Sequence, residues 1–239
     1  VRMFLPVLLL LAGIDWFSKY LYPVSEAAMG IVFQPNQLIF ILASLLISIL
    51  MATACHRFTL LPKEQWEKNA LHGFRRDEWR YLLRSILIGL VVLPIALLVM
   101  IVIMALVGQQ GMMIAAAVTV MVALYVMSRL VITLPALALG HHSTLKEAWQ
   151  LSHGYGSKLV LIVFIIPILM GSPFMLMAGL DSGVGILAYL GSFGVYITSL
   201  ISLVMLSLSY QFICDLKRVD VVTGSQSEQS SDSDNHFDA

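Results

Sequence analysis

Charged residues are scarce in this sequence. Of its 239 residues, 12% are Asp, Glu, Lys or Arg and 59% are apolar, with a mean hydropathy of +0.89. Soluble domains carry roughly one quarter charged and one half apolar residues. Several apolar runs reach about 20 residues, which is enough to cross the hydrocarbon core of a bilayer. The composition therefore excludes an ordinary soluble domain and predicts an all-α, polytopic membrane protein.

The sequence also lacks the usual signs of a reactive site. It has only two cysteines, Cys55 and Cys214, too few for a disulfide framework, and we interpret both as packing residues. No HExxH or GxSxG motif is present, and no paired carboxylates or Cys/His dyad are expected on a common face. We predict no catalytic residue and no cofactor, and therefore no enzyme activity. Nucleic-acid binding is excluded because the basic residues flank apolar runs rather than forming a separate basic face.

Three histidines, His141, His142 and His153, raise the question of a metal site. Adjacent histidines point in different directions on a helix, and no carboxylate or cysteine is expected to complete the ligand set. We predict that no metal is bound there.

The apolar runs predict about six membrane spans that form a transmembrane helix bundle. The spans cover residues 3–22, 37–55, 82–106, 112–132, 159–180 and 186–214. The first could be the core of a signal peptide, but no small-x-small cleavage site follows it, so we expect it to be retained. The last exceeds the length needed to cross and is expected to tilt or project. Residues 1–222 form the predicted membrane domain, and 223–239 form an acidic, Ser-rich tail expected to be disordered.

Basic residues are distributed unequally between the two ends of these spans. With the N-terminus inside, thirteen lie on the inner side and only Lys19 lies in the outer half; the thirteen are Arg2, Arg57, Lys63, Lys68, Arg75, Arg76, Arg80, Arg84, Arg129, Lys146, Lys158, Lys217 and Arg218. Cytoplasmic loops of membrane proteins are enriched in Lys and Arg. We therefore predict a multi-pass protein with both termini in the cytoplasm.

Two inner segments carry the candidate contact residues. Arg75, Arg76, Arg80, Arg84, Arg129 and Lys158 are candidates for contact with anionic lipid headgroups or with a partner protein. The alternative for the first four is a topology signal with no ligand, and for Arg129 a side chain that reaches to the membrane surface. Asp15 and Lys19, four apart, suit either a buried ion pair on a substrate path or an anchor in the aromatic belt around Trp16; we favour the anchor.

Residues 129–158 predict a helix break and then an amphipathic helix. Pro135 is expected to break or kink the end of the fourth span, and Gly140 to end any helix beyond it. Thr144 and Glu147 have the spacing of a capping box, which predicts a helix start. One arc of that helix is apolar and the other is polar, which predicts an interfacial helix on the cytoplasmic side; the apolar arc contains Leu145, Ala148, Trp149 and Leu151.

The two inner segments also resemble each other. Arg57 is followed 22 residues later by Trp79, and Arg129 is followed 20 residues later by Trp149. Each Trp precedes a span that contains a proline. This weak repeat suggests helical hairpins joined by interfacial helices.

Residues 129–169 resemble a pattern found in YciC-like families and in the membrane domain attached to some glycerophosphoryl diester phosphodiesterases. The pattern is filled here by Arg129, Pro135, Leu145, Ala148, Trp149, Leu151 and Gly154. The resemblance implies an uncharacterised bacterial inner-membrane protein of about six helices, and it implies no reaction. Such proteins have an interfacial helix ahead of the first span, so the resemblance also implies a truncated start at Val1.

The sequence favours one functional class and leaves a second open. The first is a non-enzymatic scaffold, assembly or envelope-maintenance component that acts through lipids or partner proteins. The alternative is a small transporter or channel, which the prolines within spans would suit. Ionisable residues are nearly absent from the middle of the spans, whereas ion-coupled carriers usually place one there.

Overall fold

The described part of the chain is helical throughout. The computed structural model describes residues 3–22, 35–66, 70, 74–141, 143–180 and 185–233. Its α-helices are α1 (Leu5–Leu21), α2 (Gln37–Leu60), α3 (Arg76–Val107), α4 (Met112–Val131), α5 (Thr133–Ala138), α6 (Leu145–Leu151), α7 (Gly156–Val160), α8 (Ile166–Leu180) and α9 (Ile186–Ser233). Two short 3₁₀ turns, Lys63–Gln65 and Gln109–Gly111, and a π-helical segment, Leu161–Ile165, complete the order. The outer loop expected at 23–36 is described only at residues 35 and 36, and the turn expected at 181–185 only at residue 185. His142 lies outside the described residues.

Among the described residues, five helices are long and apolar enough to cross a membrane, which agrees with a multi-pass membrane protein. They are Gln37–Leu60, Arg76–Val107, Met112–Ala138, Gly156–Gly179 and Ile186–Lys217. The expected first span corresponds to α1, which has 17 residues. At 1.5 Å per residue α1 is about 26 Å long, slightly shorter than a hydrocarbon core of about 30 Å.

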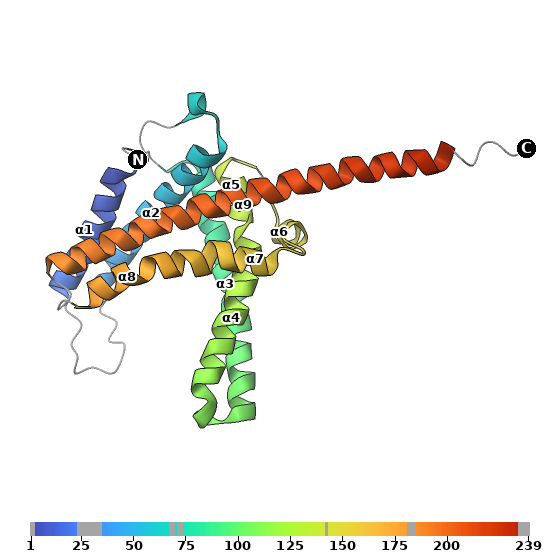
Figure 1. The fold of residues 1–239 in the computed structure, drawn as a ribbon. Coiled ribbons are helices and arrows are strands. Elements are labelled where there is room, and N and C mark those ends of the chain that lie inside the picture. The colour runs from blue at the N-terminus through green and yellow to red at the C-terminus, as the bar shows by residue number, and fades with distance from the viewer. Residues whose placement is uncertain are drawn as a thin grey trace, which may run out of the picture.

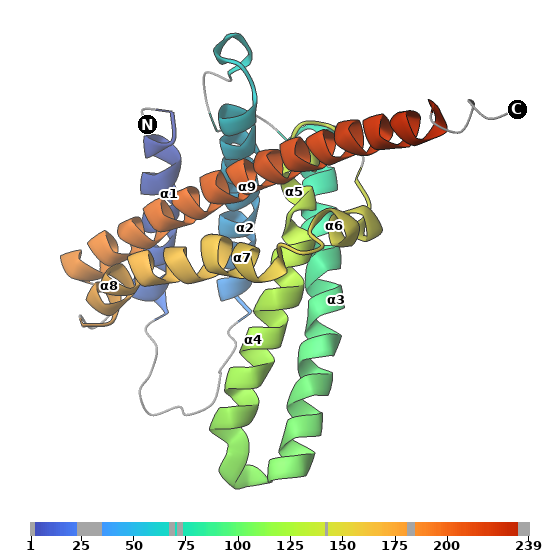
Figure 2. The ribbon, with the colours of Figure 1, turned by 45° about the vertical axis from the view of Figure 1, so that its right-hand side comes forward.

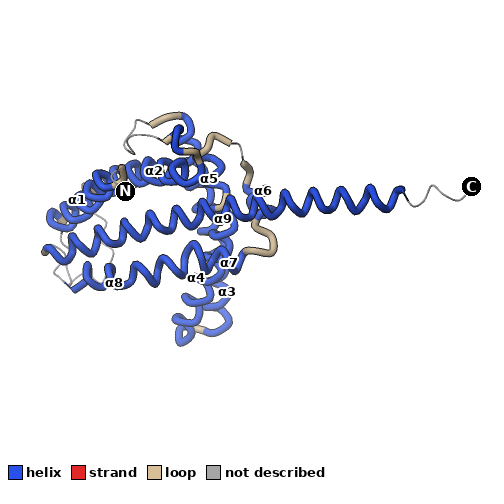
Figure 3. The backbone as a smooth tube through the Cα atoms, turned by 45° about the horizontal axis from the view of Figure 1, so that its top comes forward, coloured by secondary structure: helices blue, strands red, loops and turns tan. Residues whose placement is uncertain are grey.

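The long helices form two hairpins and a supporting pair (Figures 1 and 2). Antiparallel α3 and α4 pack along each other, and so do α8 and α9, which run across the direction of α3 and α4. Helices α1 and α2 pack on α9. One apolar cluster joins α2, α3, α5 and α9, and a second joins α1, α2 and α9. Helix α9 therefore contributes to both clusters (Figure 3).

Small residues bring α8 and α9 into close contact. A Cβ atom added to Gly191 would lie 2.6 Å from the backbone of both Ala178 and Phe174. One added to Gly194 would lie 2.2 Å from the Phe174 ring. Such close approach of two backbones is typical of helix pairs in membranes.

The break after the fourth span occurs slightly before the predicted proline. Helix α4 ends at Val131, and Pro135 is the third residue of α5, where its missing N–H removes no helical hydrogen bond. Helix α5 ends at Ala138, and Gly140 stops it as predicted by adopting a left-handed conformation, with φ of +80°. The His141 N–H donates to the Ala136 carbonyl (3.0 Å) and the Gly140 N–H to the Leu137 carbonyl (2.9 Å), which is a Schellman motif.

Helix α9 continues beyond the other helices and projects away from them (Figures 1 and 3). Its backbone is helical to Ser233, and residues 234–239 lie outside the described part. The composition of 223–239 predicts disorder, and this stays a prediction.

Candidate functional site

The ends of several long helices meet around the two short helices α5 and α6. Helix α5 contacts α2, α3 and α9, and helix α6 contacts α4. We call this region, from the C-terminal ends of α2 and α4 to the start of α3 and including α5 and α6, the junction (Figure 2). It contains most of the charged residues that the sequence predicts on one side of the membrane.

Arg57, at the end of α2, is the centre of one half of the junction. Its Nε donates to the Ala138 carbonyl at the end of α5 (2.8 Å), and its Nη1 to Oε1 of Glu78 in α3 (3.0 Å). Nη2 lies 3.4 Å from Asp77. Glu78 is fully buried, and its other oxygen accepts the Arg75 N–H (2.8 Å). The pair therefore fixes α2, α3 and α5 to one another.

Arg129, at the end of α4, holds the other half. Its Nε donates to Ser152 Oγ (3.0 Å) and its Nη2 to the Trp149 carbonyl, while its guanidinium lies 3.7 Å from the centre of the Trp149 ring. Lys217 of α9 donates to the neighbouring Gln150 carbonyl (2.6 Å). Cations from α4 and α9 thus satisfy carbonyls at the C-terminal end of α6, where the helix dipole favours positive charge.

The two arginines occupy equivalent positions, which gives the weak sequence repeat a physical meaning. Arg57 and Arg129 each end a long helix, each is more than nine-tenths buried, and each donates to a carbonyl at the end of a short helix. Each also contacts a side chain 21 or 23 residues later, Glu78 or Ser152. The tryptophans differ, because Trp149 lies under its arginine whereas Trp79 packs on Phe74.

A buried histidine that was not among the predicted site residues connects three helices. His56 of α2 is fully buried, and its ring nitrogens lie 2.7 Å from Ser207 Oγ in α9 and 3.2 Å from Tyr81 Oη in α3. The sequence shows that His56 precedes Arg57, but it does not indicate the partners of His56, because Ser207 and Tyr81 lie on distant segments of the chain.

The six candidate contact residues separate into groups. Arg75 and Arg76 are exposed at the start of α3, and Lys158 is exposed on α7 beside the Tyr155 ring. Arg129 is turned inward. Arg80 and Arg84 line a groove of about 400 Å³ between α3, α5 and the start of α6, together with Leu83, Leu87, Leu137, Ser143, Thr144 and Glu147. The structure therefore brings together two of the six, and their contact with lipid stays a prediction.

The predicted helix start at Thr144 is confirmed. The Glu147 N–H donates to Thr144 Oγ1 (3.2 Å), and the Thr144 N–H donates to Glu147 Oε2 (3.0 Å). In the predicted apolar arc, Ala148 is buried and Leu145 and Leu151 are half-buried, whereas Trp149 is exposed on one side. The helix therefore packs its small apolar side on the junction, and its position at a membrane surface stays a prediction.

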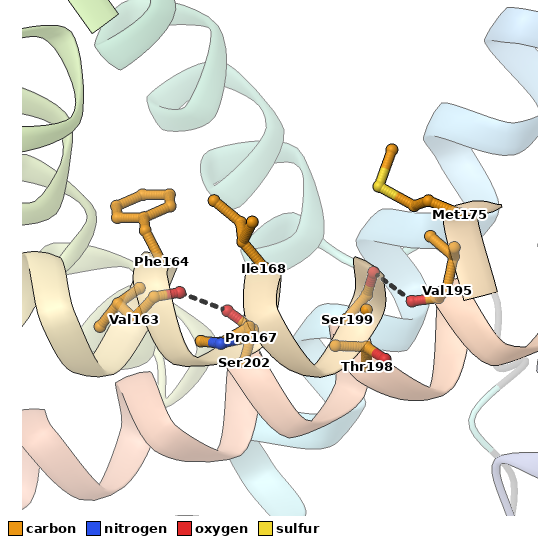
Figure 4. Close-up of a pocket in the computed structure, with 10 residues that line it drawn as sticks. Val163, Phe164, Pro167, Ile168, Met175, Val195, Thr198, Ser199 and Ser202 are labelled. Atoms are coloured by element: carbon orange, nitrogen blue, oxygen red, sulfur yellow. Dashed lines mark hydrogen bonds between the residues drawn. The ribbon is translucent and has the colours of Figure 1, made fainter. Parts of the chain in front are cut away.

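A further cavity lies between α8 and α9 (Figure 4). Its volume is about 210 Å³, and its walls are apolar apart from Thr198, Ser199 and Ser202. Ser202 Oγ donates to the Val163 carbonyl (2.8 Å), while Ser199 Oγ donates to Val195 within its own helix (3.0 Å).

The ion pair expected in the first span forms, with a partner that the sequence did not indicate. Lys19 Nζ lies 2.8 Å from Asp15 Oδ2, and the same oxygen accepts the Ser192 hydroxyl of α9. Both charged side chains are about one third exposed. Asp15, Lys19 and Ser192 therefore link α1 to α9. This link is compatible with both predicted roles of the pair, an ion pair on a substrate path and an interfacial anchor.

Comparison of the chain with known protein families, with curated proteins and with solved structures finds no match. Within the described residues, no three His, Cys, Asp or Glu side chains gather in a group that could hold a metal ion. The junction and its groove are therefore the candidate functional site.

Proposed function

We propose that this chain is a non-enzymatic component of a bacterial inner membrane, acting as a scaffold, assembly or envelope-maintenance factor whose junction docks lipids or a partner protein. The proposal is carried by the hydrogen bonds and ion pairs that the buried charged side chains make. Arg57, Glu78 and Arg129 are engaged with one another, with carbonyls or with a hydroxyl, so they hold short helices in place. A rigid platform with an exposed polar face suits docking.

The proposed topology has six spans, with α1 as the first and the junction in the cytoplasm. Its support is the collection of basic residues at one end of the helices and the 17-residue length of α1, which lies at the lower limit for a span. The resemblance to YciC-like proteins is part of this proposal and would place the protein in the inner membrane.

Co-purification from native membranes tests the docking role. The tagged chain is extracted in mild detergent, and its proteins and lipids are measured together by mass spectrometry. We expect a stoichiometric partner whose recovery falls when Lys146 and Gln150, on the exposed face of α6, are replaced by glutamate. The control Gln110→Ala, at the α3–α4 turn, should retain it. Equal recovery with both variants would contradict docking at α6.

The cavity beside α8 favours a small transporter or channel as the second candidate. Transporters often build substrate sites where a helix is interrupted, and α8 follows a π-helical segment and contains Pro167 and Pro173. Solute flux into vesicles reconstituted with this chain alone would favour transport, and the absence of flux together with a retained partner would favour the scaffold.

A further inference from the structure

The groove beside α3 has two guanidinium groups with unused hydrogen-bond donors. Arg84 makes no hydrogen bond or ion pair within the part of the chain that the structure describes, and Arg80 meets only Asp77, at 3.6 Å. The two side chains are four residues apart, so they lie on one face of α3. Both line the same groove, where their planar forks are suited to a phosphate group.

The opposite wall of the groove carries a negative charge. Glu147 of α6 accepts the Thr144 N–H through Oε2, and its other oxygen makes no hydrogen bond among the described residues. Ser143 and Thr144 lie beside it. The groove therefore offers positive charge on one wall and a carboxylate on the other.

Apolar side chains continue the groove along the same face of α3. Leu83 and Leu87 line the groove beside Arg80 and Arg84, and Leu90 lies one turn further along that face. These three leucines are exposed, with exposed fractions of 63%, 41% and 64%. Since α3 is an apolar helix long enough to cross a membrane, the leucines lie toward the membrane interior and the two arginines toward its edge.

We propose that this groove binds one membrane glycerophospholipid with an amine-bearing headgroup, such as phosphatidylethanolamine. The phosphate lies between Arg80 and Arg84, the ammonium group donates to Glu147, and an acyl chain lies along the exposed leucines of α3. A purely anionic headgroup would meet the Glu147 carboxylate without a cation to balance it, and a soluble phosphate would leave these leucines uncovered. The inference rests on the proposed membrane function and names its lipid.

Native mass spectrometry of the purified full chain tests this site. The protein is mixed with equal amounts of phosphatidylethanolamine and phosphatidylglycerol that carry the same acyl chains. We expect one phosphatidylethanolamine retained in preference by the wild type. Arg84→Gln should weaken its retention by about tenfold, the effect of losing one charged hydrogen bond. Lys63→Gln, at an exposed lysine outside the groove that is not one of the candidate contact residues, should change nothing.

The variant Glu147→Gln distinguishes recognition of the ammonium group from recognition of the phosphate. Glutamine can still accept the Thr144 N–H, so the start of α6 is preserved. We expect this variant to lose the preference for phosphatidylethanolamine while still binding phosphatidylglycerol. Size-exclusion profiles and circular dichroism matching the wild type show that each variant is folded.

Three results would overturn the lipid site: equal retention of the two lipids by the wild type, a preference for phosphatidylglycerol, or groove variants that behave like Lys63→Gln. If one of these is found while a partner protein still co-purifies in an α6-dependent way, the docking function stands and only the lipid site fails. If lipid selectivity is found and no partner depends on α6, the docking of a protein partner fails and the lipid site stands.

Discussion

At the scale of single residues, the polar side chains of this protein satisfy backbone groups that proline leaves without partners. Pro167 has no N–H, so the Val163 carbonyl, four residues earlier, loses its helical hydrogen bond; Ser202 of α9 donates to it instead. Pro173 frees the Leu169 carbonyl in the same way, and Ser172 donates to it at 2.9 Å. Inside a bilayer no water can replace these bonds, which explains why α8 tolerates both prolines.

The hydroxyl of Ser202 should therefore contribute more to stability than that of its neighbour Ser199. Ser202→Ala leaves the Val163 carbonyl without a donor and should lower the free energy of unfolding by about 1 kcal/mol. Ser199→Ala, whose hydroxyl only reinforces a carbonyl of its own helix, is the matched control and should have little effect. Unfolding in mixed micelles of increasing SDS content, followed by circular dichroism, measures both. Equal losses would contradict this role for Ser202.

The Arg57–Glu78 pair provides a second test at this scale. Removing one partner leaves the other charge buried and uncompensated, so Arg57→Met should destabilise the protein by about 3–5 kcal/mol. Adding Glu78→Met removes the orphaned charge, and the double variant should lose at least about 1 kcal/mol less than the sum of the single variants. Arg76→Met, at an exposed position nearby, is the control. Additive losses in the same SDS titration would show that the two side chains are not coupled.

The sequence could identify these arginines but not their partners. Arg57 and Arg129 were visible because each ends an apolar run, and the spacing to the following tryptophans indicated a repeat. Their burial was not predictable, because a flanking arginine is equally suited to water and lipid phosphate. The burial of each arginine depends on the position of the Ala138 or Trp149 carbonyl, and this position depends on how α5 and α6 fold back.

At the scale of elements, the α8–α9 pair depends on glycine at its contact. Gly191→Ala would place a Cβ 2.6 Å from two backbone atoms of α8, which cannot move like a flexible side chain. We expect the helices to separate and the free energy of unfolding to fall by about 1–3 kcal/mol. Gly179→Ala on α8, where no atom lies within 4 Å of the added Cβ, is the control. A Gly191→Ala variant as stable as this control would contradict the close packing.

The helix boundaries show which local signals were sufficient. The capping box at Thr144 and the left-handed Gly140 depend on a few adjacent residues, and both were predicted. The break between α4 and α5 was expected at Pro135 but occurs at Ile132, so the proline begins a new helix instead of ending the old one. The π-helical segment before Pro167 was not predicted; it contains Val163, whose carbonyl accepts the Ser202 hydroxyl of α9.

At the scale of the whole molecule, the two hairpins extend from the junction in different directions (Figure 1). Helix α3 has 32 residues, about 48 Å, and is much longer than a bilayer core of about 30 Å. Only 6% of its most apolar window is buried, so most of that window is exposed or half-buried. Long helices accommodate such a mismatch by tilting, as expected for the last span, and the crossing hairpins would both tilt.

The sequence predicted the number of long apolar segments better than their arrangement. Hydropathy alone locates five of the expected spans within a few residues. The crossing of α8–α9 over α3–α4 was not predictable, because lipid-facing and helix-facing surfaces are equally apolar and only small residues such as Gly191 mark a contact.

Helix α1, with 17 residues, is the shortest of the six proposed spans. A reporter fused to its N-terminus tests whether it crosses the membrane. If α1 crosses the membrane, a reporter placed before Val1 shares the cytoplasm with one placed after residue 217. Alkaline phosphatase should then be inactive, and green fluorescent protein fluorescent, at both ends. An active phosphatase only at the N-terminus would show that α1 does not cross.

The most direct test of the whole account is the side of the membrane on which the junction lies. In a background without the two native cysteines, single cysteines replace Lys146 on α6 and Gln110 at the α3–α4 turn. A membrane-impermeant maleimide added to spheroplasts should label the Gln110→Cys variant at once and the Lys146→Cys variant only after the membrane is opened. Labelling of both from the outside, or of Lys146→Cys alone, would contradict a cytoplasmic docking platform.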